Sequence, residues 1–231
     1  DWKQWRSQQN AASLAIAKNV PSIERIKWSL GQAPKTLPPV NQAEFFTDAE
    51  SSLMTHDRWT PRGVHRVPIH FGHGVRGNLY FKDGAPTPMP VVVWLHPLSY
   101  HSGYNEGYGV QGTTVYQRLA ENGFAVIAYD QCGFGLRLLE GRDFYKNHPR
   151  WSKLGRMVMD ARAAVSFAVE GRGAAKSAIP EFDTKRVFLL GYSSGALTAM
   201  YAGALDDRVA GVACFSGWTP LRNAGNARAT G

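Results

Sequence analysis

One serine in this sequence lies between two glycines at a spacing that suits nucleophilic chemistry. The stretch FLLGYSSGAL, residues 188–197, places Gly191 two residues before Ser193 and Gly195 two residues after it. Because glycine has no Cβ, the backbone at both positions can approach a neighbouring strand and helix, and such a sharp turn exposes the serine Oγ. We therefore predict that Ser193 is a nucleophile. The alternative interpretation is a tight turn that serves packing alone.

A serine nucleophile needs a neighbouring group that accepts its proton, and histidine is the usual one. All histidines of the chain precede Ser193; they lie at positions 56, 65, 70, 73, 96, 101 and 148. The acids that follow Ser193 are Asp206 and Asp207, and their position between a predicted helix and the next strand puts them at the wrong end of the sheet. A base at His101, in a rearranged site, is one alternative that the sequence leaves open.

Several continuous apolar runs predict strands that are buried on both faces, as in the middle of a parallel sheet. VVVWL at 91–95 and FAVIAYD at 124–130 are two of them, and TTVYQRLAENG at 113–123 between them has the pattern of a helix. Gly123 is placed as the stop signal of this helix. Strand, helix and strand in this order form the unit that connects parallel strands.

The same order repeats towards the C-terminus. Residues 152–170 carry apolar side chains on one helical face, and RVFLLGY at 186–192 is the next strand. A helix rich in alanine and glycine at 194–205 and the strand VAGVACF at 209–215 follow. Together with a hairpin of GVHRVPIHF and RGNLYFK, they predict a doubly wound α/β domain with a mostly parallel sheet.

We expect two parts in the chain: an N-terminal helical extension over residues 1–62 and the α/β core over 63–231. The extension contains SIERIKWSL at 22–30, whose apolar residues recur at helical spacing, and prolines follow it. We expect it to pack on the core, and we recognise no chemistry in it.

Composition limits the kinds of partner and cofactor. The 231 residues are 44% apolar and carry a formal net charge of +8, but Lys and Arg are scattered, so we expect no nucleic-acid partner. The longest apolar runs are far shorter than the roughly 20 residues of a membrane span, so we expect no membrane partner. Cys132 and Cys214 form neither a disulfide framework nor a metal motif, and we interpret them as free thiols in or near the core. The chain starts at Asp1 without methionine, which is compatible with removal of an export segment or of a tag, so the compartment stays open, with a secreted or periplasmic location as one expectation.

Four stretches resemble a known superfamily in their order and spacing. They are WLHPLSYHSGY, AYDQCGFGLR, FYKNHPRWSKLGRMVMDARAAVSF and LLGYSSGALTAM. Over roughly residues 63–231 the sequence resembles the α/β-hydrolase superfamily of serine esterases, and within it the acetyl xylan esterases and dienelactone-hydrolase-like carbohydrate esterases. The resemblance implies that Ser193 cleaves carboxylic esters through an acyl-enzyme, on acetylated or otherwise esterified carbohydrate, with no metal or organic cofactor.

The resemblance also implies roles for residues around Ser193. The backbone N–H groups of Leu98 and Ser194 correspond to the oxyanion hole. Pro97 replaces the glycine that usually follows the histidine, which leaves two alternatives: Pro97 stiffens the loop while Leu98 still donates, or the donor shifts from Leu98 to Ser99. The resemblance further suggests that His96 braces this loop and that Asp130 and Arg137 pair to hold the next one. Aromatic side chains near the active-site edge are candidates for substrate binding: Tyr100, Tyr104, Tyr192 and Trp218.

In the superfamily the acid and the histidine follow the nucleophile, on loops after later strands. Six of the eight strands of that fold are recognised here, so we expect the last two strands, the acid and the base to lie outside this chain. A C-terminal polypeptide of roughly 100 residues is the expected partner that completes the sheet and the triad. Two alternatives remain: a serine peptidase of the prolyl-oligopeptidase type, although no repeats precede the domain, and a non-catalytic binding protein with this fold.

Overall fold

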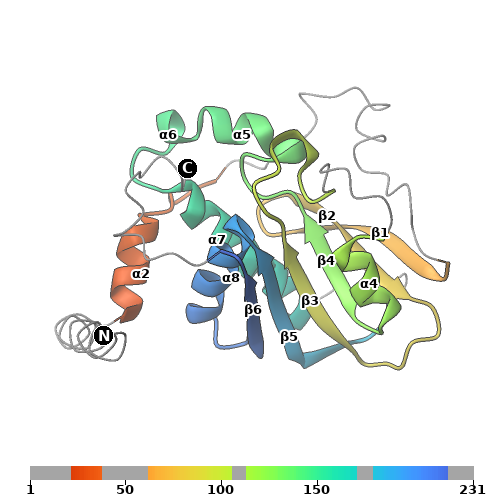
Figure 1. The fold of residues 1–231 in the computed structure, drawn as a ribbon. Helices are drawn as coiled ribbons and strands as arrows, with labels where there is room; N and C mark the ends of the chain where they lie inside the picture. The colour runs from red at the N-terminus through yellow and green to blue at the C-terminus, as the bar shows by residue number, and fades with distance from the viewer. Residues whose placement is uncertain (1–21, 38–61, 106–112, 171–178, 218–231) are drawn as a thin grey trace, which may run out of the picture.

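The computed structural model describes residues 22–37, 62–105, 113–170 and 179–217. Within these ranges the strands form one six-stranded sheet in the order β1-β2-β4-β3-β5-β6 (Figure 1). The strands are β1 (Val64–Phe71), β2 (Val75–Lys82), β3 (Met89–Leu95), β4 (Ala125–Tyr129), β5 (Phe182–Tyr192) and β6 (Gly211–Phe215).

The pairing confirms the predicted α/β class. β1 and β2 form an antiparallel hairpin, and β2 also pairs antiparallel with β4. From there the sheet is parallel, because β3 pairs in parallel with both β4 and β5, and β5 pairs in parallel with β6. The carboxyl ends of these four strands therefore meet at one edge, where α/β folds bind their ligands.

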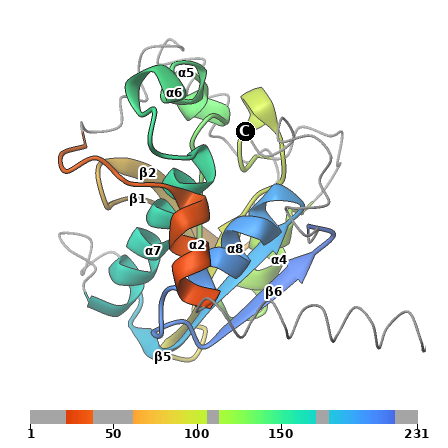
Figure 2. The same cartoon turned by 90° about the vertical axis from the view of Figure 1, so that its left-hand side faces the viewer.

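Helices cover both faces of the sheet (Figures 1 and 2). On one face, α7 (Lys153–Glu170) and α8 (Ser194–Ala204) pack against side chains such as Val91 and Val93 of β3. On the opposite face, α4 (Val115–Glu121) packs against their neighbours Val92 and Trp94. This alternation explains why the middle strands are apolar at every position: both of their faces belong to a core.

Two of the helices, α4 and α7, begin where the sequence supplies capping groups. At the start of α4 the Thr114 side chain accepts a hydrogen bond from Gln117 N, and the Gln117 side chain accepts one from Thr114 N, which is a capping box. Gly123 follows the helix with a φ of +88°, as its predicted role as a stop signal requires. At the start of α7 the Ser152 hydroxyl accepts from Gly155 N at 2.9 Å.

Part of the predicted N-terminal extension is a helix, α2 (Ser22–Leu30), which lies over α7 and α8 (Figure 2). Its carboxyl end is tied to the start of α7, because the Ser152 backbone N–H and hydroxyl both donate to Leu30 O, at 3.0 and 2.8 Å. Residues 1–21 and 38–61 lie outside the described residues, so the boundary at residue 62 stays a prediction.

The strand β6 forms one edge of the sheet, and no described strand pairs with its outer side. Two of its large apolar side chains are exposed, Val212 to 43% and Phe215 to 57%. Soluble proteins usually cover such an apolar parallel edge, so this edge is a candidate contact surface. Among the helices of the described residues, none has the length and apolar character that crossing a membrane requires.

Candidate active site

Ser193 occupies the turn between β5 and α8, at the carboxyl edge of the sheet. Its φ is +53° and its ψ is −118°, a backbone conformation that residues with a side chain rarely adopt. Hydrogen bonds hold the turn from both sides: Ser193 N donates to Phe215 O at 2.9 Å, and Ala196 N donates to Ser193 O at 3.0 Å. Strained conformations that the surrounding structure enforces in this way cluster at functional sites.

The two glycines that flank Ser193 are needed for close packing. A Cβ at Gly195 would lie 2.6 Å from His96 O and would overlap Leu95 O, at the end of β3. A Cβ at Gly191 would lie 2.5 Å from Ala196 N, in the first turn of α8. The strand, the turn and the helix can therefore meet only where both side chains are missing, which is the physical basis predicted from the sequence.

The first turn of α8 directs its backbone N–H groups towards this edge. The first N–H groups of a helix have no acceptor within the helix, and the helix dipole places partial positive charge there. Ser194 is the first residue of α8, so its N–H belongs to this set. Leu98 lies in the loop after β3, next to the backbone that packs on Gly195. The assignment of the Leu98 and Ser194 amides to an oxyanion hole stays a prediction.

His96 is a buried structural residue, as predicted. Its Nε2 accepts a hydrogen bond from Gln131 N at 3.0 Å, and its Nδ1 lies 2.7 Å from Pro97 O. A nitrogen that faces a carbonyl must donate, so the ring is neutral with its proton on Nδ1. Burial lowers the pKa of His96 from 6.5 to about 4, and the charge of Arg137 adds to the effect. With both nitrogens bonded to the backbone, this ring braces its loop.

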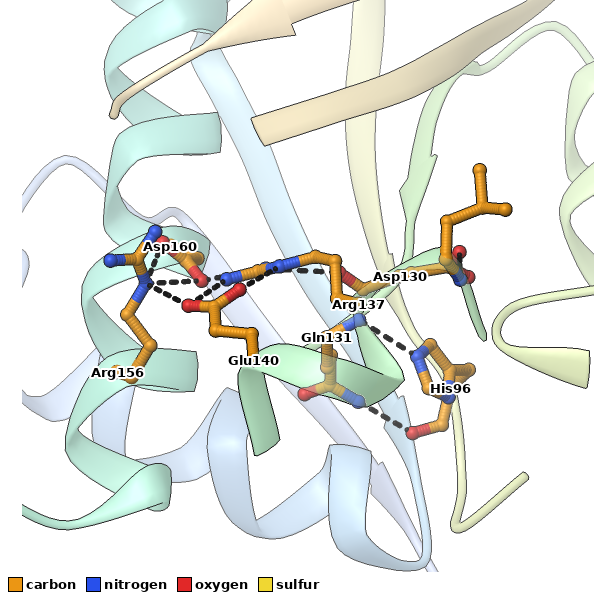
Figure 3. Close-up of polar contacts among 8 residues, drawn as sticks. His96, Asp130, Gln131, Arg137, Glu140, Arg156 and Asp160 are labelled. Carbon is orange, nitrogen blue, oxygen red and sulfur yellow. Dashed lines mark hydrogen bonds and ion pairs between the residues drawn. The ribbon is translucent and has the colours of Figure 1, made fainter. Parts of the chain in front are cut away.

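Asp130 and Arg137 both hold the loop after β4, but they do so differently from the prediction (Figure 3). The Asp130 carboxylate accepts hydrogen bonds from Tyr104 N and Leu136 N, both at 2.9 Å. The Arg137 side chain donates to the main-chain oxygen of Asp130 at 3.0 Å, and not to its carboxylate. The structural role is confirmed, and the partner of Arg137 is corrected, because its guanidinium reaches carboxylates that sequence proximity did not reveal.

Those carboxylates belong to a buried ionic cluster between this loop and α7 (Figure 3). Arg137 bonds Glu140 with two nitrogens, at 2.8 and 3.0 Å, and Asp160 with a third at 2.8 Å. Arg156 adds contacts of 3.0 Å to Asp160 and 3.4 Å to Glu140. The two positive and two negative charges balance, which limits the cost of their burial.

Sequence reasoning missed this cluster. Its signal was present in the helix at 153–170, where Arg156 and Asp160 lie four residues apart on the side that also carries buried apolar residues. Charged residues in such positions are rarely buried unless they are paired. The pairing of Arg156 and Asp160 with Glu140 and Arg137 depends on how the loop after β4 folds. No local sequence pattern predicts this pairing.

Comparison with known protein families identifies the family of this chain. Residues 91–228, more than half of the chain, match the hydrolase family described as serine aminopeptidase, S33. The chain belongs to the S33 hydrolase family. This membership, together with the order of strands and helices, confirms the predicted resemblance to the α/β-hydrolase superfamily and its fold. No curated protein matches the sequence.

Three solved structures illustrate what the S33 chain is similar to. A dienelactone hydrolase-like promiscuous phosphotriesterase from metagenomic libraries has 22% identity and a TM-score of 0.46, over 71% of this chain and 63% of that one. A dienelactone hydrolase from Anabaena variabilis has 19% identity and a TM-score of 0.47, over 66% and 63%. A candidate acetyl xylan esterase from Bacteroides fragilis has 16% identity and a TM-score of 0.48, over 71% and 50%. The chain thus spans 50% to 63% of the length of these three proteins.

The aromatic residues proposed to bind substrate in this S33 protein fall into different environments. Tyr100 and Tyr192 are exposed, to 65% and 44%, and Tyr192 directly precedes Ser193. Tyr104 is only 3% exposed, and its hydroxyl accepts a hydrogen bond from Asn78 Nδ2 at 2.6 Å, so the structure places it in the core. Trp218 lies outside the described residues.

Asp206 and His101 are the other candidates for the catalytic acid and base. Asp206 lies at the far end of α8 from Ser193, where Arg208 bonds its carboxylate at 2.8 Å, so its predicted distance from the site is confirmed. Burial raises the pKa of Asp206, but the hydrogen bonds and the charge of Arg208 lower it more, and the carboxyl keeps its charge. The side chain of His101 lies outside the described part of the chain.

Two further features lie apart from Ser193. Cys132 and Cys214 are free thiols, the first buried in the loop after β4 and the second exposed on β6. A pocket of about 260 Å³ lies between residues 32–35 and 147–150, and none of the residues around Ser193 lines it. The candidate site is therefore defined by the turn at Ser193 and not by this pocket.

Proposed function

We propose that this S33 protein hydrolyses carboxylic esters through an acyl-enzyme on Ser193. The observation that carries the proposal is the positive φ of Ser193, between two glycines that cannot accept a Cβ, at the amino end of α8. A packing turn needs no serine in a strained conformation, whereas a nucleophile gains exposure and a nearby positive helix terminus from it.

The reaction follows from these groups. The Ser193 oxygen attacks the ester carbonyl carbon while a histidine accepts its proton. The amides of Ser194 and Leu98 bind the resulting oxyanion. The C–O bond to the alcohol then breaks, and the alcohol leaves with the proton from the histidine. Water attacks the acyl-enzyme by the same route and releases the acid and free Ser193.

We further propose that the histidine and its acid come from polypeptide that packs beyond β6. His96, whose backbone packs on the turn of Ser193, has both ring nitrogens committed to the backbone. The outer side of β6 exposes Val212 and Phe215, and added strands would cover them. Denaturing mass spectrometry on the active protein tests this. If a single 25.4 kDa species retains full esterase activity, the proposal is wrong.

Esterified carbohydrate is the proposed substrate class. The rings of Tyr100, in the loop after β3, and of Tyr192, the residue before Ser193, support it, because both are exposed and an exposed aromatic face suits a sugar ring. We expect release of acetate from acetylated xylan, and we expect Tyr192→Ala to raise KM for xylan more than KM for p-nitrophenyl acetate. Equal changes for both substrates would contradict a sugar contact at Tyr192.

Peptide hydrolysis is a second candidate, because the family that matches the chain is described as a serine aminopeptidase. The same acyl-enzyme chemistry cleaves amides, but the leaving amine must be protonated as the C–N bond breaks. Turnover of an aminoacyl p-nitroanilide at a rate above that of p-nitrophenyl acetate would favour the peptidase. Turnover of neither substrate by the protein together with the polypeptide that supplies the histidine would favour a binding protein with this fold.

The decisive experiment compares two adjacent serines. Ser193→Ala should lower kcat for p-nitrophenyl acetate by at least about 1000-fold, because the nucleophile is lost. Ser194→Ala is the matched control, because it keeps the backbone N–H, and its hydroxyl is buried and makes no hydrogen bond within the described residues. Activity that survives Ser193→Ala would remove the basis of the proposed function.

A further inference from the structure

The loop that begins with His96 is packed directly on the turn of Ser193. Leu95 O and His96 O approach Gly195 so closely that no side chain fits between them. The position of the peptide groups in residues 96–98 is therefore coupled to the turn that presents Ser193. The hydrogen bonds that fix this loop are the basis of the inference, which rests on the proposed function.

Gln131 donates two hydrogen bonds to His96 (Figure 3). Its backbone N–H donates to His96 Nε2 at 3.0 Å, and its side-chain Nε2 donates to His96 O at 2.8 Å. The first of these bonds makes Nε2 an acceptor and so leaves the ring proton on Nδ1. The second holds the main chain of His96 where it meets Gly195.

The proton on His96 Nδ1 then determines the orientation of the next peptide group. Nδ1–H donates to Pro97 O at 2.7 Å, and the Ser99 hydroxyl lies 3.0 Å from the same nitrogen. Pro97 O and Leu98 N–H belong to one planar trans peptide group and point in opposite directions. Fixing the oxygen therefore fixes the direction of the Leu98 N–H. Pro97 cannot donate a hydrogen bond itself, so Leu98 supplies the first N–H after His96.

Gln131 is in turn held by buried groups on both sides. Asp130 precedes it, and the carboxylate of Asp130 ties Tyr104 N to Leu136 N. Arg137 bonds the Asp130 main-chain oxygen and connects it to Asp160 of α7. The connection from α7 to the loop at 96–98 thus runs through hydrogen bonds and ion pairs among buried residues.

We propose that His96 and Gln131 are positioning residues of the hydrolytic site, which orient the Leu98 N–H towards the oxyanion formed at Ser193. They act through the peptide group between Pro97 and Leu98. Loss of this orientation should destabilise the transition state more than the bound substrate, because only the oxyanion depends strongly on the Leu98 amide. A change here should lower kcat and leave KM nearly unchanged.

Two substitutions of His96 distinguish a role in orienting the Leu98 N–H from a role in stabilising the fold alone. His96→Gln keeps an acceptor near the place of Nε2 and loses the donor to Pro97 O. His96→Asn keeps a donor near the place of Nδ1 and loses the acceptor. Loss of one oxyanion donor lowers kcat by about 100- to 1000-fold in known cases. We expect His96→Gln to lower kcat for p-nitrophenyl acetate by about 10- to 100-fold, with KM within about threefold, and His96→Asn to restore about tenfold of that loss.

Gln131→Glu provides an independent readout. A carboxylate at this position cannot donate to His96 O, whereas a protonated carboxyl can. The ratio of kcat in Gln131→Glu to kcat in the wild type should therefore rise as pH falls from about 8 to about 5. Gln117→Met is the control for loss of a buried amide, since Gln117 caps α4 and is equally buried. It should lower the thermal midpoint and leave kcat unchanged.

All variants are measured in the complete protein, and circular dichroism and thermal unfolding confirm that each is folded. Equal kcat losses in His96→Gln and His96→Asn, or a flat kcat ratio for Gln131→Glu, would overturn the positioning role. If Ser193→Ala retains activity, the proposed function fails instead. If Ser193→Ala is inactive while His96→Gln keeps the wild-type kcat, only the positioning role fails.

Discussion

Replacing His96 with glutamine should change how the stability of this protein responds to acid. In the folded protein both nitrogens of His96 are bonded, Nε2 as an acceptor from Gln131 N. Protonation of Nε2 would place two N–H groups face to face in the core, so the folded state binds this proton poorly. In the unfolded chain the same ring is free to take it up. Acid therefore favours unfolding through this residue, and glutamine removes the effect.

The size of the effect follows from the two pKa values of His96. Its pKa falls from 6.5 in the unfolded chain to about 4 in the folded protein, chiefly through burial. The stability contributed by the neutral ring is fully present above about pH 6.5 and is lost as pH falls towards 4. Linkage gives a loss of about 2 kcal/mol at pH 5 and about 3 kcal/mol at pH 4.

The wild type alone does not reveal this loss, because Asp130 acts in the opposite direction. Burial raises the pKa of Asp130 from 3.8 to about 6, so the folded protein takes up this proton more readily than the unfolded chain. Its contribution to stability grows as pH falls from 6 towards 3.8. The two buried groups largely compensate each other between pH 4 and 6.5.

The assay is therefore a double comparison. The free energy of unfolding in urea is measured for the wild type and His96→Gln at several values between about pH 8 and pH 4. Asp130 is present in both proteins, so its contribution cancels in the difference. The stability of His96→Gln relative to the wild type should rise by about 3 kcal/mol over this range. Parallel curves, or a relative stability that falls with acid, would refute the assignment of a neutral, bonded His96.

The remaining predictions concern packing and buried charge. Gly195→Ala should destabilise the protein by about 3 kcal/mol and lower esterase activity, since its Cβ would overlap Leu95 O at the end of β3; a wild-type thermal midpoint would contradict the close approach. Arg137→Met should cost about 3–5 kcal/mol in urea unfolding, because Asp160 keeps a buried charge and loses a 2.8 Å partner. The matched control Arg142→Met removes an exposed pair and should stay within about 0.5 kcal/mol. Equal losses of stability in Arg137→Met and Arg142→Met would show that burial does not raise the cost of breaking an ion pair here.

Much of the fold could be predicted from local sequence patterns. The doubly apolar runs became β3 and β4, and the amphipathic pattern at 152–170 became α7 with its predicted apolar positions buried. The turn at Ser193 could also be predicted, because two glycines at fixed spacing describe a local close approach. These features depend on the periodicity of apolar residues and on the size of side chains. Short stretches of sequence determine both.

Partners of buried polar groups could not be predicted in the same way. The sequence placed Asp130 seven residues from Arg137 and suggested that they pair, whereas Arg137 reaches Glu140 and Asp160 instead. Tyr104 had the type and position of a pocket residue, yet its hydroxyl is bonded in the core. A guanidinium or hydroxyl can bond many acceptors, and which one it meets depends on the segments that packing brings together.

The sequence by itself thus determined the α/β order of elements, the glycine-flanked turn of Ser193 and the apolar middle strands and helix face of the core. Only the tertiary structure decided that Gln131 bonds both the ring and the main-chain oxygen of His96. The physical reason is the range of the interactions. Steric requirements and hydrophobic periodicity act between near neighbours in the chain, whereas Gln131 and His96 are 35 positions apart and meet only because β3 and β4 are adjacent strands.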